Sequence, residues 1–108
     1  DCNGHPENAL TRDEMLDNVM MYWLPGTGAS SARLYWESFN NRSSDPIRVP
    51  VGASIFPREI FRASRRWAEK AIANIIYWNE LDKGGHFAAF EQPAQYVEEV
   101  RNCFRLVR

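Results

Sequence analysis

The sequence has only two cysteines, Cys2 and Cys103, which stand near opposite ends of its 108 residues. Because there is neither a CxxC pair nor a dense cysteine spacing, the sequence predicts no disulfide scaffold and no zinc site. Reduced thiols are typical of the cytoplasm, so we expect a cytoplasmic protein. No other motif for a metal or a cofactor is present, and none is predicted.

Long apolar runs and an excess of one charge are also missing. No run approaches the roughly 18–20 residues that a membrane-spanning helix needs, so no membrane segment is expected. The net charge of −1 argues against a nucleic acid or a membrane surface as partner. A basic cluster surrounds Trp67, but no nucleic-acid-binding motif accompanies it, which favours a solvated helix face. The cluster comprises Arg58, Arg62, Arg65, Arg66 and Lys70.

The beginning of the chain lacks a signal-peptide pattern, because no charged segment followed by an apolar one is found there. It also lacks an initiator methionine, so we expect that Asp1 is not a natural N-terminus. Residues 1–10 predict a polar loop in which His5 is exposed.

The first part of the chain predicts two helices. Thr11 and Glu14 form a capping box, and the apolar residues that follow have helical spacing up to Pro25-Gly26, which ends the helix. The small residues 27–31 form a turn that lacks the GK[ST] of a phosphate-binding loop. Ser30 or Ser31 is expected to cap a second helix that runs to about Phe39. The first helix's apolar face comprises Met15, Leu16, Val19, Met20, Trp23 and Leu24.

The second helix is rich in aromatic residues, so it should either pack on the first helix or line a pocket. Tyr35 lies in it, and taken alone Tyr35 is better explained as a packing residue than as a functional one.

The second part of the chain predicts a strand–helix–strand–helix order after a polar loop at residues 40–46. The buried strands are expected at residues 47–56 and 74–81, and Ser64 is expected to cap a short helix to about Lys70. The last helix starts at Gln92-Pro93, with the apolar face Tyr96, Val97, Val100, Phe104 and Val107. Its residues Glu98, Glu99, Arg101 and Arg105 are expected to face mainly outward.

This order is typical of an α/β protein with parallel strands and helical crossovers. Two parallel strands cannot form a finished sheet, because they need cover on both faces and pairing at their edges. Either a partner completes the sheet, or the chain is one end of a larger α/β domain. We favour the larger domain.

One histidine and one glutamate follow the two predicted strands. Gly84-Gly85 gives the chain the freedom to aim His86, and Glu59 comes just after the first strand. The carboxyl ends of parallel strands share one edge of a sheet, so the two side chains are expected within hydrogen-bond distance. A carboxylate on one imidazole nitrogen leaves the other free as a base. Taken singly, His86 is explained equally well by a hydrogen-bonded surface turn, and Glu59 is better explained as a surface salt-bridge partner of a nearby arginine.

Three segments resemble epoxide hydrolases of the α/β-hydrolase superfamily, of the microsomal type and its bacterial relatives. Residues 84–93 resemble the catalytic-histidine motif, and residues 56–59 resemble the segment that carries the acid. Residues 21–35 resemble a lid segment with a tyrosine that grips the epoxide oxygen. The resemblance runs from about Leu10 onward. It implies that residues 1–46 are part of a helical lid and residues 47–108 are the C-terminal end of the core.

The resemblance also implies a mechanism in two steps. An aspartate attacks the epoxide and forms an ester while Tyr35 donates to the opening oxygen. A water that His86 deprotonates, with Glu59 behind it, then releases a vicinal diol. No Gly-x-Asp-x-Gly elbow occurs in the sequence. The nucleophile is therefore expected in an N-terminal remainder, in the same protein or in an accompanying chain, and these residues alone are predicted to be inactive.

Two other readings remain open. An esterase would carry a serine at the elbow, and a haloalkane dehalogenase would carry an aspartate without lid tyrosines. These two enzymes share the fold and form one of the two readings, and in the other the chain is a non-catalytic fragment that only supplies packing surface. The presence of His86, Glu59 and Tyr35 together favours the epoxide reading, and a view of the sequence before Asp1 would decide between them.

Overall fold

The computed structural model describes residues 1–39 and 45–108. The chain divides into two units, one of Cys2–Ser44 and one of Asp1 with Asp45–Arg108. Most of the polar loop predicted at residues 40–46 lies outside the described residues. The assignment of residues 1–46 to a lid and of residues 47–108 to a core stays a prediction.

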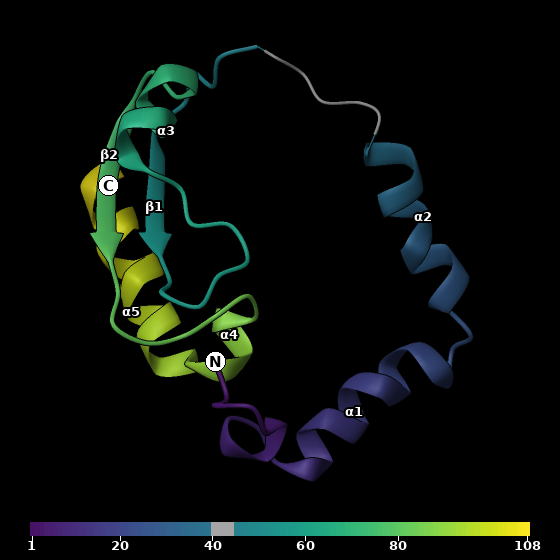
Figure 1. Cartoon of the computed structure of the whole chain (residues 1–108). Coiled ribbons are helices and arrows are strands. Elements are labelled where there is room, and N and C mark those ends of the chain that lie inside the picture. Colours follow the sequence, from purple (N-terminus) through teal and green to yellow (C-terminus); the bar gives the residue numbers. More distant parts are fainter. Residues whose placement is uncertain (40–44) are drawn as a thin grey trace. The chain divides into compact units, whose positions relative to one another are not determined.

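The first unit contains helices in its described part. A 3-10 helix, η1 (Pro6–Asn8), precedes α1 (Arg12–Trp23) and α2 (Gly28–Ser38) (Figure 1). The capping box is confirmed, because Thr11 Oγ1 accepts the Glu14 N–H at 3.2 Å and Glu14 Oε2 accepts the Thr11 N–H at 2.7 Å. The end of α1 before Pro25-Gly26 is confirmed as well.

The start of the second helix differs from the prediction. It begins at Gly28 with Thr27 as the N-cap residue, and no side chain caps it. Ser30 and Ser31 instead donate back to the carbonyl oxygens of Thr27 and Gly28, at 3.1 and 2.9 Å. Serine hydroxyls inside a helix form such bonds to the preceding turn. The prediction that either serine caps α2 is therefore wrong.

The apolar side chains of the first unit are exposed. Trp23 is 78% exposed, Trp36 is 84% exposed, and neither α1 nor α2 contributes a buried residue. The helical periodicity that the sequence predicts is present, but no face of either helix is buried within this unit.

The second unit is built on a two-stranded parallel sheet of β1 (Val51–Ile55) and β2 (Ile75–Glu80), as the sequence predicts. Both strands are shorter than expected. Ile47 does not extend β1 but forms an isolated parallel bridge with Ile72, and Pro50 precedes β1 because it has no N–H to give to a ladder. The strands are only partly buried, since the described residues pair each of them along one edge only.

Four helical segments accompany the sheet: α3 (Arg65–Ala71), α4 (Ala88–Glu91), α5 (Pro93–Phe104) and η2 (Arg105–Val107). Ser64 is the N-cap residue of α3, but its side chain makes no capping hydrogen bond, so that detail of the prediction is wrong. Pro93 at the first turn of α5 is confirmed. The sequence predicts no helix at α4, which is too short to show a period.

Helix α5 contacts the sheet through a polar side chain. Glu99 is 6% exposed and accepts hydrogen bonds from Ser54 of β1 at 2.7 Å and from Tyr77 and Asn79 of β2 at 3.0 and 2.9 Å. The expectation that Glu99 faces outward is wrong. The sheet presents hydroxyl and amide groups here, so a carboxylate satisfies them where an apolar residue would not.

The apolar face that the sequence predicts for α5 is exposed to solvent. Tyr96, Val97, Val100 and Phe104 are all at least 39% exposed. Among the hydrophobic residues that the structure describes, only Phe56 and Ala88 are buried. These apolar faces are surface that a larger α/β domain would cover.

Candidate active site

The candidate site begins where the parallel pairing continues past the two strands. After Ile55 pairs with Glu80, the chains separate and meet again in a parallel bridge between Arg58 and Gly85. The Arg58 N–H donates to the Gly84 carbonyl at 3.0 Å. The next residue on each side is Glu59 and His86, so backbone pairing alone makes these two residues neighbours.

Gly84 allows the turn that leads into this bridge. Its φ of +98° lies in the left-handed region, which glycine adopts without steric cost. A Cβ atom at this position would lie 2.7 Å from Cδ1 of Phe56, which is too close for two carbon atoms. The turn that the sequence predicts at the glycine pair therefore needs glycine at Gly84, both for its positive φ and because a larger side chain would collide with Phe56.

His86 and Glu59 are hydrogen-bonded. Nδ1 of the imidazole lies 2.6 Å from Oε1 of Glu59, which confirms the contact expected from the sequence. The same oxygen accepts the N–H of Ile60 at 2.7 Å, so the carboxylate is held by its own backbone as well. The side chains are 52% and 31% exposed, respectively, and the imidazole is open to small molecules.

The pair has a defined charge arrangement. The hydrogen bond from His86, with a further one from the Ile60 N–H, holds the pKa of Glu59 below its ordinary value. Glu59 is therefore ionised at neutral pH and acts as the acceptor for the Nδ1 proton. Nε2 is then the nitrogen that carries a free lone pair in the neutral ring.

A cavity of about 440 Å³ adjoins the pair. His86 and Glu59 contribute a hydrogen-bonded acid–base pair to its lining, and its walls are largely aromatic. They comprise Phe56, Phe87, Phe90 and Tyr96, with Ser54, Ala88 and Ala89 between them. The ring of Phe87 packs edge-on against the imidazole with centroids 4.9 Å apart. An apolar hollow with one acid–base pair suits a small, weakly polar ligand.

The sequence interpretation gave no role to Glu91 beyond its place in the resemblance. Its carboxylate accepts the backbone N–H groups of Gly85 at 2.7 Å and Phe87 at 3.2 Å. These residues flank His86. The sequence offered no signal for this role, because the contact depends on α4, which is too short to show a helical period.

Tyr35 lies in the other unit. It is 63% exposed, and with Leu34, Ser38 and Phe39 it lines a hollow of about 360 Å³ on α2. This agrees with the expectation that the aromatic helix lines a pocket. The structure brings His86 and Glu59 together, whereas the place of Tyr35 relative to them stays a prediction of the resemblance.

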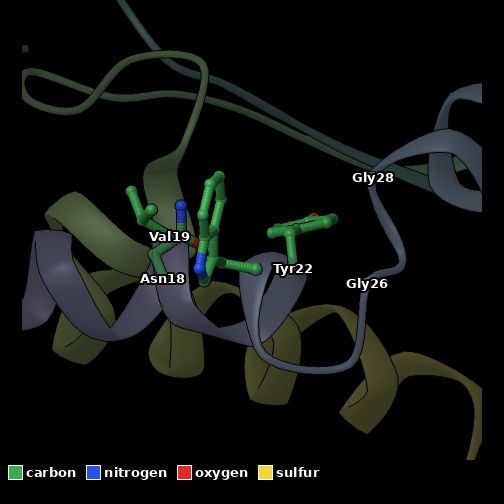
Figure 2. Close-up of a pocket in the computed structure, with 6 residues that line it drawn as sticks. Asn18, Val19, Tyr22, Gly26 and Gly28 are labelled. Atoms are coloured by element: carbon green, nitrogen blue, oxygen red, sulfur yellow. The ribbon is translucent and has the colours of Figure 1, made fainter.

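A second hollow in the first unit has no catalytic group of the expected kind among the residues that line it. It measures about 580 Å³ and is lined by Asn18, Val19, Tyr22, Trp23, Gly26 and Gly28. Figure 2 shows the side chains of Asn18, Val19 and Tyr22 on α1 and the turn through Gly26 and Gly28 that follows this helix. With neither a carboxylate nor an imidazole in its lining, this hollow offers no acid–base pair.

Residues 1–39 and 45–108 show neither a metal-binding cluster nor a membrane-spanning helix. These residues contain no group of three or more His, Cys, Asp or Glu side chains that could hold a metal ion. None of the helices formed by them is long and apolar enough to cross a membrane.

Comparison with known proteins gives several relatives, although no family model matches the chain. A protein of Stigmatella aurantiaca named "Putative epoxide hydrolase" is 59% identical over 100% of the chain. Epoxide hydrolase 1 of Sus scrofa is 32% identical over 97% of it. Juvenile hormone epoxide hydrolase 2 of Ctenocephalides felis is 33% identical over 91% of it.

The chain spans 22% to 25% of the length of these relatives. Its parallel strands with flanking helices agree with the end of an α/β-hydrolase sheet. The resemblance inferred from the three sequence segments is thereby confirmed. The chain is a relative of the epoxide hydrolases, and it corresponds to a C-terminal portion of their α/β-hydrolase fold.

Proposed function

We propose that this chain contributes the water-activating half of an epoxide hydrolase, with His86 as general base, Glu59 as its partner and Tyr35 as an acid in the lid. The substrates are a small-molecule epoxide and water, and the product is a vicinal diol. The remaining machinery, including an aspartate nucleophile, belongs to sequence N-terminal to these residues or to an accompanying chain.

The first step forms an ester. A carboxylate oxygen of the aspartate attacks one epoxide carbon, and the bond from that carbon to the epoxide oxygen breaks. An alkoxide is a poor leaving group, so it needs a proton as it forms, and the Tyr35 hydroxyl supplies it. The step ends with a hydroxyalkyl ester and a tyrosinate.

The second step hydrolyses that ester. Nε2 of His86 takes a proton from a water, whose oxygen attacks the ester carbonyl carbon. The acyl–oxygen bond breaks and the second hydroxyl of the diol takes up a proton from the imidazolium. Hydrolysis leaves the aspartate as a carboxylic acid, whose proton is the second proton of the attacking water. This proton returns to the tyrosinate, which restores both the aspartate carboxylate and the Tyr35 hydroxyl. Glu59 holds Nδ1–H throughout and stabilises the positive charge that His86 carries between the two transfers.

The observation that carries the proposal is the hydrogen bond of 2.6 Å between His86 Nδ1 and Glu59 Oε1. It defines the tautomer in which Nε2 is basic, beside a cavity with aromatic walls. Surface salt bridges do not need such a cavity. The names of the relatives favour an epoxide over an ester or a haloalkane as the substrate.

A chimera tests the proposal. These 108 residues replace the matching segment of the Stigmatella aurantiaca relative, and the unmodified relative serves as reference. A single turnover of styrene oxide, with enzyme in excess, is run in water labelled with oxygen-18. If an enzyme ester forms, the new hydroxyl of the diol comes from the unlabelled carboxylate. Label in the diol after one turnover would mean that water attacks the epoxide directly.

A His86→Gln variant of the chimera isolates the second step. Ester formation does not use the base, so we expect the hydroxyalkyl adduct to accumulate and to add the mass of styrene oxide to the protein. Absence of an adduct in a variant that still binds the epoxide would remove His86 from the base role.

A further inference from the structure

The Glu91 carboxylate accepts hydrogen bonds from the backbone on both sides of His86. Its Oε2 atom accepts the N–H of Gly85 at 2.7 Å, and its Oε1 atom accepts the N–H of Phe87 at 3.2 Å. The two amides belong to the residues immediately before and after His86. One carboxylate therefore fixes the backbone on both sides of the histidine.

The carboxylate is well shielded. The Glu91 side chain is 9% exposed, and Gly85, one of its two donors, is buried. A buried N–H without an acceptor costs free energy, so the Gly85 amide depends on this partner. The nitrogen of Asp1 also donates to Oε2, at 2.5 Å, and this third contact does not involve the histidine loop.

These two hydrogen bonds of Glu91 affect the direction in which the His86 imidazole points. The Cα–Cβ bond of His86 is set by the backbone on each side of it. Glu91 holds the peptide unit after His86 through the Phe87 N–H, and before His86 it holds the Gly84–Gly85 unit, which is one residue further away. The ring is then held at its far end by Glu59. The imidazole is half exposed and packs against the ring of Phe87, and the two carboxylates restrict it further.

We propose that Glu91 is a positioning residue, whose carboxylate orients the loop so that His86 meets Glu59 and aims Nε2 at the hydrolytic water. The expected effect of Glu91 on the rate of ester hydrolysis rests on the proposed function. Its expected effect on the geometry of the His86–Glu59 pair does not. Glu91 takes part in neither proton transfer.

The test replaces Glu91 by glutamine in the chimera. The two amides need two acceptor oxygens, and glutamine has one oxygen and one NH₂ group, so one amide loses its partner. We expect the rate constant of ester hydrolysis to fall on the order of 10-fold, because small misplacement of a catalytic group is costly. The rate constant of ester formation should not change, since that step does not use His86.

Two further variants sharpen the test. Glu98→Gln removes the same charge from the exposed face of α5 and should leave both rate constants unchanged. Glu91→Asp keeps the charge but is too short to reach both amides, so it should slow ester hydrolysis as well. It decides the question if Glu91→Gln fails to fold. A role in stability alone would lower the amount of active enzyme and both steps together.

A spectroscopic readout separates this inference from the proposed function. The proton between His86 Nδ1 and Glu59 gives a downfield proton resonance, which Glu59→Gln assigns by its loss. We expect Glu91→Gln to shift or broaden this resonance and Glu98→Gln to leave it in place. An unchanged resonance together with an unchanged hydrolysis rate would overturn the role of Glu91. If the unsubstituted chimera opens no epoxide, the proposed function fails, and the resonance alone decides on Glu91.

Discussion

Arg58 pairs with Gly85 beyond the ends of β1 and β2, and this bridge makes Glu59 and His86 neighbours. Residues 56–57 on one side and residues 81–84 on the other form the loops that the bridge closes. The acid and the base are therefore aligned by main-chain hydrogen bonding, and their side chains only complete the contact at 2.6 Å. Loops positioned by a sheet in this way are common sites of catalytic groups.

Glu59→Gln should weaken ester hydrolysis in the chimera while ester formation is retained. A glutamine in this position can offer its NH₂ group to Nδ1 and so stabilise the tautomer in which Nε2 carries the proton. The loss should be on the order of 10⁴-fold in the rate constant of that step, as for the change of aspartate to asparagine beside the histidine of a serine protease. Single-turnover kinetics measure it.

The matched control for this variant is Glu69→Gln, which removes a carboxylate from an exposed pair with Arg65 in the same unit. It should leave both steps intact. A loss in Glu69→Gln equal to that in Glu59→Gln would assign the effect to net charge and not to the tautomer.

The pKa of Glu59 should depend on His86. The hydrogen bond from His86, followed by that from the Ile60 N–H, lowers this pKa in the folded protein. The stability that the pair contributes is therefore fully present above the pKa of Glu59 in the unfolded chain. It is lost as the pH falls through the lowered, folded value. We expect His86→Ala to move the pKa of Glu59 upward, toward its ordinary value.

Carbon-13 NMR of labelled glutamate carboxyl groups in the chimera measures this pKa, with Glu59→Gln to identify the signal. A midpoint that stays in place when His86 becomes alanine would show that the imidazole does not act on Glu59.

Tyr35→Phe should slow ring opening more than ester hydrolysis, because only the first step needs a proton on the opening oxygen. General-acid assistance is typically worth about 10²–10⁴-fold. The control is Tyr22→Phe, which removes a hydroxyl from α1 in the same unit and should have no such effect. Equal losses in both steps for Tyr35→Phe would exclude the acid role.

The sequence predicts the parallel strands and most of the helices because these depend on local signals. The capping box at Thr11, the stop at Pro25-Gly26 and Pro93 at the start of α5 each act within one or two turns. The contact of Glu59 with His86 was predictable because parallel strands share an edge. The strand ends were less predictable, since Ile47 has a strand-like side chain but pairs only in an isolated bridge.

The sequence predictions that are wrong concern tertiary contacts and helix ends, which the spacing of apolar residues does not reveal. Glu99 has the charge of an outward residue, and the hydroxyls of Ser54 and Tyr77 with the amide of Asn79 on the sheet make it a buried acceptor. Glu91 gains its role from a four-residue helix that no pattern predicts. Ser30 and Ser31 are good N-cap residues, yet the helix already includes them.

Glu99→Ala should destabilise the chimera. It leaves the hydroxyls of Ser54 and Tyr77 and the amide of Asn79 without an acceptor in a partly buried place. Hydrogen bonds to a charged group and the cost of unpaired donors together suggest a loss of about 3 kcal/mol in the free energy of unfolding. Urea denaturation measures it, and Glu98→Ala, on the exposed face, should change this free energy by less than about 0.5 kcal/mol.

The carboxylate also affects Tyr77. Burial raises the pKa of this phenol, and the hydrogen bond to Glu99 raises it further. Absorbance titration of the tyrosines should therefore show a lower pKa for Tyr77 in the Glu99→Ala variant. A Tyr77 pKa that does not fall would place Tyr77 outside the network.

The 108 residues by themselves should neither fold cooperatively nor open epoxides. A two-stranded sheet is marginal in water, and only Phe56 and Ala88 are buried among the hydrophobic residues that the structure describes. The aromatic faces of α1, α2 and α5 are exposed, and the site has a base but no nucleophile elbow. Calorimetry of the purified chain should give no cooperative transition, and no diol should form from styrene oxide. Turnover that is absent from the chain's own His86→Ala variant would show that the residues present suffice for the reaction.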